Sequence, residues 1–238
     1  MLYNLPDAEA IFFDLDDTLY DQLLPFQSAL KYAKLQIDPA NYEVIYKRVR
    51  FYSDLLWKSY TKGELTLEQV RSERLKCALR EFEIDLSNEQ AIEIQERYQY
   101  EQKVIELFPH VKSIIKELQN QDKVVGIITN GPVEHQMSKI IALQLDRIIS
   151  NELIFISDGI GLTKPDKRVF EYVQKQVKIS AGKCLYIGDT WENDIAPPIE
   201  AGWKSIWFNY RNRKPQSHHQ PSLVIKEYDK IIKKILSR

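Results

Sequence analysis

Three aspartates close the first strongly apolar stretch of the chain. The run Ile11-Phe12-Phe13 has no polar residue and predicts a short buried strand, and Asp14, Asp16 and Asp17 follow it directly. Like charges this close raise one another's pKa, and lost hydration at an apolar edge adds to the cost. A bound cation or an electropositive ligand offsets that cost. This strand end is therefore the first candidate for a functional site.

Polar residues follow two later apolar stretches in the same way. Thr129-Asn130-Gly131 follows Val124–Ile128, and Gly188-Asp189, with Asp194 shortly after, follows Lys183–Ile187. Between them Lys164 precedes Pro165 and an expected helix start. In open α/β sheets, ligands bind beyond the carboxyl ends of the strands. We therefore expect six side chains to converge on one point: Asp14, Asp16, Thr129, Lys164, Asp189 and Asp194.

Each of these residue types has a role if the ligand is a phosphate. Asp14 can act as a nucleophile that forms an aspartyl-phosphate, and Asp16 can give a proton to the leaving alkoxide and later take one from water. Asp14 and Asp189 offer the oxygen ligands that Mg²⁺ prefers. Asp194 is expected to orient the water shell of the metal or Lys164.

The remaining candidates would bind the phosphate itself. Thr129 with the backbone amides of Asn130 and Gly131 is expected to form a phosphate cradle at a helix N-terminus. Lys164 supplies a compact positive charge that stabilises the transferring oxygens and balances the carboxylates.

Short, wholly apolar segments separated by helix-sized stretches predict an α/β fold with a parallel sheet covered on both faces. The expected strands are Ala10–Phe13, Val124–Ile128, Lys183–Ile187 and Trp203–Phe208, with a weaker one at Arg147–Ser150. Apolar residues at helical spacing predict a last helix over Val224–Leu236 that packs on the sheet.

The stretch between the first two strands is too long for an ordinary crossover. It carries several helical patterns and no convincing strand, with capping boxes expected at Thr66/Gln69 and Ser87/Gln90. We interpret residues 20–104 as an inserted helical-bundle cap domain. Residues 1–19 and 105–238 would then form the α/β core domain.

Composition points to an ordinary globular protein of 238 residues with a formal net charge of −1. This charge offers no global field for a nucleic acid polymer or a membrane surface, and no leader or membrane-spanning run stands out. Two widely spaced cysteines favour a reducing, cytoplasmic compartment. A monomer or weak homodimer acting on a small phosphorylated metabolite is the expectation.

Other polar residues carry no such signal. The stretch Asn209–Pro221 is interpreted as an exposed loop, with Arg211, Arg213 and Lys214 as solvated charges. The four histidines show no spacing suited to a zinc site.

Together, Asp14-Leu15-Asp16-Asp17-Thr18, Thr129-Asn130-Gly131, Lys164-Pro165-Asp166 and Gly188-Asp189 with Asp194 resemble the four motifs of the haloacid-dehalogenase (HAD) superfamily, in the family's order. The insert resembles the C1 cap of its subfamily I. The resemblance implies a Rossmann-like core, Asp14 as nucleophile and Asp16 as acid/base. It also implies Mg²⁺ held by Asp14, the Asp16 carbonyl and Asp189.

The resemblance favours a phosphatase, because dehalogenating members lack an acid two residues after the nucleophile and Asp16 is present here. Its phosphatases commonly act on nucleotides, sugar phosphates or phosphoglycolate. Three alternatives stay open at this point: a phosphomutase on the same scaffold, a receiver-type signalling protein, and a pseudoenzyme that binds phosphate without turnover.

Overall fold

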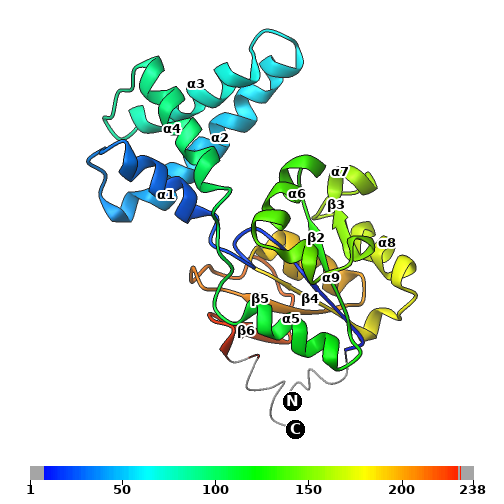
Figure 1. The fold of residues 1–238 in the computed structure, drawn as a ribbon. Helices are drawn as coiled ribbons and strands as arrows, with labels where there is room; N and C mark the ends of the chain where they lie inside the picture. The colour runs from blue at the N-terminus through cyan, green and yellow to red at the C-terminus, as the bar shows by residue number, and fades with distance from the viewer. Residues whose placement is uncertain (1–7, 230, 232–238) are drawn as a thin grey trace. The chain divides into compact units, whose positions relative to one another are not determined.

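The computed structural model describes residues 8–229 and 231, and it divides the chain into two compact units (Figure 1). One unit comprises residues 1–21 and 106–238, and the other comprises residues 22–105. The sequence predicts the inserted unit at residues 20–104. The first unit contains the sheet, and the second is helical.

In the part of the first unit that the structure describes, six strands lie in one parallel sheet, in the order β3-β2-β1-β4-β5-β6. This confirms the predicted α/β, Rossmann-like core. Parallel strands covered on both faces are largely apolar, and every residue of β1 and β4 is buried. The strands are β1 (Ala10–Phe13), β2 (Val124–Thr129), β3 (Ile154–Ile156), β4 (Cys184–Gly188), β5 (Lys204–Phe208) and β6 (Leu223–Ile225).

The register of the sheet brings three strand ends to one edge. Phe13 pairs with Ile127 of β2 on one side and with Ile187 of β4 on the other. The backbone amide of Asp14 donates to the Ile187 carbonyl at 2.9 Å. The residues that follow β1, β2 and β4 therefore emerge side by side.

Helices of the first unit follow the strands. They are α5 (Val111–Asn120), α6 (Val133–Ala142), α7 (Ser157–Ile160), α8 (Arg168–Val177) and α9 (Ala196–Glu200), with a π-helical turn at Trp191–Ile195. On one face of the sheet, Phe12 packs against Phe155 and Trp203, and Phe170 of α8 packs against Tyr186 and Trp203. This aromatic cluster fixes the strands that carry the site.

The second unit is a bundle with its own apolar core. Its helices are α1 (Leu23–Tyr32), α2 (Tyr42–Thr61), α3 (Leu67–Arg80) and α4 (Asn88–Glu101). Thr66 and Ser87 form the predicted capping boxes with Gln69 and Gln90, which satisfy amides at the first turns of α3 and α4. Phe26 packs against Tyr46 in a tilted arrangement and lies edge-on to Tyr98 in this core.

Two expectations about secondary structure were wrong. Residues 147–150 form no strand; a 3₁₀ turn covers Leu145–Arg147, and the edge strand is β3, whose three apolar residues are too few to stand out. The expected helix from Val224 does not begin there, because Leu223–Ile225 joins the sheet as β6. Residues 230 and 232–236 of that helix lie outside the described part of the chain.

Among the described residues, no helix is long and apolar enough to cross a membrane.

Candidate active site

Lys164 is the centre of a buried polar cluster beyond the strand ends. Its Nζ donates to Asp14 Oδ1 at 2.8 Å, to Asp194 Oδ1 at 2.6 Å and to the Tyr186 hydroxyl at 2.7 Å. The hydroxyl of Tyr186, on β4, donates a hydrogen bond to the Ile128 carbonyl at 2.6 Å. Although burial lowers the pKa of Lys164, Asp14 and Asp194 raise it well above its usual value, so this lysine is a fixed positive charge.

Asp14, Asp189 and Asp194 crowd together at the ends of β1 and β4. Burial raises the pKa of Asp14 to about 7; Lys164 opposes the rise, whereas the charges of Asp194 and Asp16 add to it. Burial and the charges of Asp194 and Asp14 also raise the pKa of Asp189 well above its usual range. The cluster holds more negative charge than its protein cations balance.

These three carboxylates form a donor set that fits a metal ion. Asp14, Asp189 and Asp194 each offer an oxygen, and these oxygens lie within 4.8 Å of one another. An all-oxygen, carboxylate-rich set suits a hard cation such as Mg²⁺. The raised pKa values of Asp14 and Asp189 support the same conclusion, because a dication would stabilise both ionised forms.

Asp16 lies in a separate environment that strongly stabilises its ionised carboxylate. Lys139 Nζ lies 2.8 Å from both of its carboxylate oxygens, Gln136 Nε2 donates to Oδ2 at 3.1 Å, and the Tyr20 hydroxyl donates to Oδ1. Burial raises the pKa of Asp16, but Lys139 and these hydrogen bonds outweigh it and lower the pKa to about 2. Lys139 is itself buried in α6.

The segment after β2 forms hydrogen bonds with both Asp16 and the loop that carries Lys164. Gln136 Nε2 donates to Thr129 Oγ1 at 3.0 Å as well as to Asp16, which connects the end of β2 to the end of β1. The Asn130 side chain makes two bonds to the backbone of Lys164, at 2.8 and 3.0 Å, and so fixes the loop that carries this lysine. The Gly131 amide, expected in a phosphate cradle, donates here to Ser157 Oγ at 2.9 Å.

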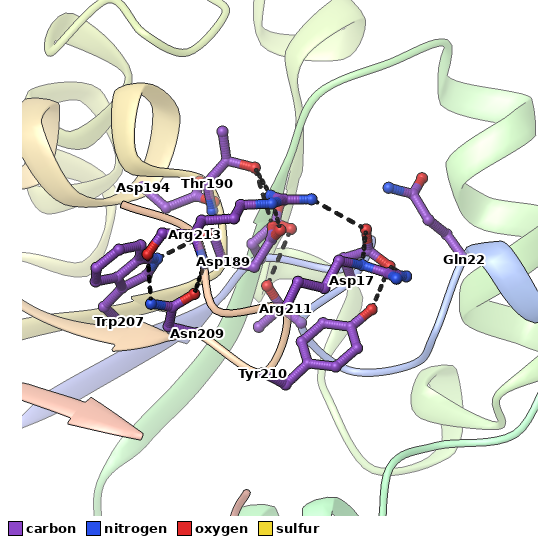
Figure 2. A network of polar contacts seen from close by, with 12 residues as sticks. Asp17, Gln22, Asp189, Thr190, Asp194, Trp207, Asn209, Tyr210, Arg211 and Arg213 are labelled. Carbon is purple, nitrogen blue, oxygen red and sulfur yellow. Dashed lines mark hydrogen bonds and ion pairs between the residues drawn. The ribbon is translucent and has the colours of Figure 1, made fainter. Parts of the chain in front are cut away.

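The interpretation of Arg211 and Arg213 as solvated charges was wrong. Figure 2 shows both directed at acidic residues of the site. Arg213 Nη1 lies 2.5 Å from Asp189 Oδ2, and Arg211 Nη2 lies 2.9 Å from Asp17 Oδ1 and 2.7 Å from Asp21 Oδ1. The loop after β5 folds back over the strand ends, which its polar composition did not indicate.

The structure thus gathers the predicted residues into one network and adds others that the sequence did not single out. The additions are Gln136, Lys139, Ser157, Tyr186, Arg211 and Arg213. A usable signal existed for two of them: Gln136 and Lys139 share one face of a helix that starts directly after Thr129-Asn130-Gly131.

The chain thus combines a parallel sheet, a buried lysine and a carboxylate cluster at one edge of that sheet with an inserted helical unit. A family profile described as haloacid dehalogenase-like hydrolase matches residues 8–202. The chain belongs to this family. Membership in a hydrolase family disfavours the receiver-type alternative.

Relatives and solved structures agree with this assignment. The chain is 26% identical to the pyrimidine 5'-nucleotidase YjjG of Escherichia coli over 226 residues, which cover 90% of this chain and 92% of YjjG. It is 28% identical to the HAD-hydrolase YfnB of Bacillus subtilis over 204 residues, covering 84% and 83%. It is 25% identical to a phosphoglycolate phosphatase of Pseudomonas fluorescens over 227 residues, which cover 93% of this chain and 78% of that enzyme.

Two solved structures share the fold. The crystal structure of YfnB bound to magnesium superposes with a TM-score of 0.69 at 23% identity, covering 97% of this chain and 99% of YfnB. A dehalogenase with an intermediate complex superposes with a TM-score of 0.74 at 16% identity, covering all of both chains. At these identities the likeness concerns the fold.

Proposed function

We propose that the protein is a Mg²⁺-dependent phosphohydrolase that cleaves a small phosphate monoester through an aspartyl-phosphate on Asp14. The observation that carries the proposal is the contact of Asp14 with Lys164 beside two further buried carboxylates. The phosphatase and nucleotidase relatives support the substrate class, and the magnesium-bound structure of YfnB supports the choice of metal.

In the first half-reaction, an oxygen of Asp14 attacks phosphorus and the bond from phosphorus to the leaving oxygen breaks. Asp16 gives that oxygen its proton. In the second half-reaction, water attacks the phosphorus of the aspartyl-phosphate, Asp16 takes the proton, and the bond to Asp14 breaks to release inorganic phosphate. Lys164 neutralises charge on the transferring oxygens.

Mg²⁺ would be held by the carboxylates at the ends of β1 and β4, where it supplies positive charge to a phosphate that meets an anionic nucleophile. Asp194 contacts Lys164 directly, which supports its assignment as a residue that positions the lysine. Thr129 and the amides after it remain the proposed phosphate contacts, and Gly131 would exchange its bond to Ser157 for one to phosphate.

Solved dehalogenases share the fold, and Asp16 is the residue that favours phosphate over halide. A halide leaves without a proton, whereas an alkoxide needs one. In this chain Asp16 is present and held by three side chains. A phosphate monoester is therefore the better match.

The test measures phosphate release from p-nitrophenyl phosphate and from a panel of nucleotides, sugar phosphates and phosphoglycolate, ranked by kcat/KM. Asp14→Asn and removal of Mg²⁺ with a chelator should each abolish turnover, whereas Asp146→Asn, an exposed aspartate, should not. Retained activity of Asp14→Asn would overturn the proposal. Interconversion of sugar phosphates faster than phosphate release would identify a mutase, and phosphate binding without turnover a pseudoenzyme.

A further inference from the structure

We propose that Arg213 is a built-in counter-ion of Asp189 that weakens the binding of a divalent cation at the Asp14, Asp189 and Asp194 carboxylates. The inference rests on the metal site of the proposed function. It concerns the affinity of that site for a cation, and it gives the loop that follows β5 the role of placing Arg213 beside Asp189.

The guanidinium of Arg213 contacts the metal-binding edge directly. Nη1 lies 2.5 Å from Asp189 Oδ2 and 3.4 Å from Thr190 Oγ1, and Nη2 lies 3.7 Å from Asp17 Oδ2 (Figure 2). Thr190 Oγ1 also donates to the other oxygen, Asp189 Oδ1, at 3.1 Å. Arg213 therefore occupies an oxygen that a cation would seek.

The loop is built to hold the arginine in this place. The Asn209 side chain accepts from the Arg213 amide at 2.7 Å and donates to its carbonyl at 2.9 Å. Tyr210 and Arg211 each bind Asp17 Oδ1, at 2.7 and 2.9 Å. These bonds fix the loop independently of the contact with Asp189.

Burial shows which partner can move. The side chain of Arg213 is 31% exposed, whereas that of Asp189 is 6% exposed. The guanidinium covers the carboxylate from the solvent side, so it can turn outward and be hydrated while Asp189 stays in place. Asp17 keeps Tyr210 and Arg211 when Arg213 leaves, so only Asp189 loses its counter-charge.

The energetic consequence follows from charge. A positive group beside a carboxylate lowers the negative potential that attracts a dication, and here it also binds the same oxygen. Removing that charge should tighten Mg²⁺ binding on the order of tenfold. A lysine at position 213 would retain the positive charge on a shorter side chain, so it should keep the Mg²⁺ affinity near the wild-type value.

The experiment measures the Kd of Mg²⁺ by calorimetry, and of Mn²⁺ by electron paramagnetic resonance, on the full chain without substrate. Arg213→Gln should bind both ions about tenfold more tightly, and Arg213→Lys should stay within about threefold of wild type. Lys214→Gln is the matched control, because it removes the same charge from the next, exposed residue. It should leave the Kd unchanged.

A second measurement uses the wild-type protein and does not depend on the folding of a variant. The side-chain ¹⁵N signal of Arg213, assigned with Arg213→Lys, should shift toward that of a solvated arginine as Mg²⁺ is added. An equal or weaker Kd in a folded Arg213→Gln, or an unmoved arginine signal, would overturn the inference while leaving the metal site standing. Failure of wild type and Arg213→Gln to bind either ion would overturn the proposed function as well.

Discussion

Lys139 Nζ lies 2.8 Å from each of the two carboxylate oxygens of Asp16, although the two residues are 123 positions apart in the chain. Gln136, one turn earlier on α6, binds the same carboxylate at 3.1 Å. The side chain proposed as acid and base is thus held by the helix that follows β2. Its orientation depends on a lysine with no direct role in the chemistry.

Lys139 should therefore act as a positioning residue for Asp16. Lys139→Met should lower kcat for alkyl phosphates by about 10- to 100-fold, within the range that general acid–base catalysis contributes. The loss should be smaller for p-nitrophenyl phosphate, whose leaving group needs no proton. Because Lys139 lowers the pKa of Asp16, the limb of the pH profile that reports this carboxyl should lie at higher pH in Lys139→Met than in wild type.

A double variant separates positioning from a general structural effect. In an Asp16→Asn background, Lys139→Met should cost little more, because residues that act as a unit are not additive. Lys116→Met, which removes an exposed lysine of α5, is the control and should have no effect. Equal, additive losses in both backgrounds would contradict the assignment.

Gly188 ends β4 at a point where a side chain has no room. A Cβ there would lie 2.4 Å from Asp194 Cβ and 2.5 Å from its Cγ. Gly188→Ala should displace Asp194 from Lys164, reduce the free energy of unfolding by about 1–3 kcal/mol and weaken Mg²⁺ binding. Gly182→Ala is the matched control, since a Cβ at Gly182 meets nothing within 4 Å. Thermal melts and metal titrations should be measured for both variants. If Gly188→Ala and Gly182→Ala behave alike, the claim that position 188 has no room for a side chain is refuted.

Tyr186 holds Lys164 through its hydroxyl, which also donates to the Ile128 carbonyl. Tyr186→Phe leaves that carbonyl without its donor and Lys164 with one acceptor fewer, so it should cost about 1–3 kcal/mol of stability. We expect kcat to fall with little change in KM, because the lysine acts on the transferring oxygens. A rise in KM at constant kcat would instead indicate a role in ground-state binding.

The strand-end residues were predictable because their position follows from a general property of parallel sheets. Asp14, Thr129 and Asp189 each end an apolar run, and parallel strands bring their carboxyl ends to one edge. Lys139 and Arg213 were not predictable in this way. A buried lysine on an amphipathic helix and an arginine in a polar loop have the same local pattern as solvated charges, and their partners lie far off in sequence.

The difference between local pattern and distant partners also explains why the sequence did not predict the edge strands β3 and β6. β1 and β4 are longer apolar runs, and each pairs with a neighbouring strand on both sides. Their apolar pattern alone therefore identifies them. β3 and β6 have three residues each and pair on one side only, and their place is set by the strands beside them. Tertiary context decides such short edge strands.

The protein without metal should lose stability as the pH rises above about 4. Burial raises the pKa of Asp14 from 3.8 to about 7 and that of Asp189 well above its usual value. Between pH 4 and 7 the unfolded chain ionises these carboxyls while the folded one resists, so the unfolded state binds fewer protons and stability falls with pH. Thermal melts in chelator should show a lower Tm at pH 7.5 than at pH 5.5, by roughly 2–4 °C for each kcal/mol lost.

Mg²⁺ should reverse this trend because it binds the ionised carboxylates of the folded state. Its addition should raise Tm more at pH 7.5 than at pH 5.5. Asp14→Asn removes one of the two titrating groups and should flatten the pH dependence in chelator, whereas Asp146→Asn should not. A metal-free Tm that stays level or increases from pH 5.5 to 7.5 would show that Lys164 and Arg213 already balance the cluster, and the case for a cation there would be lost.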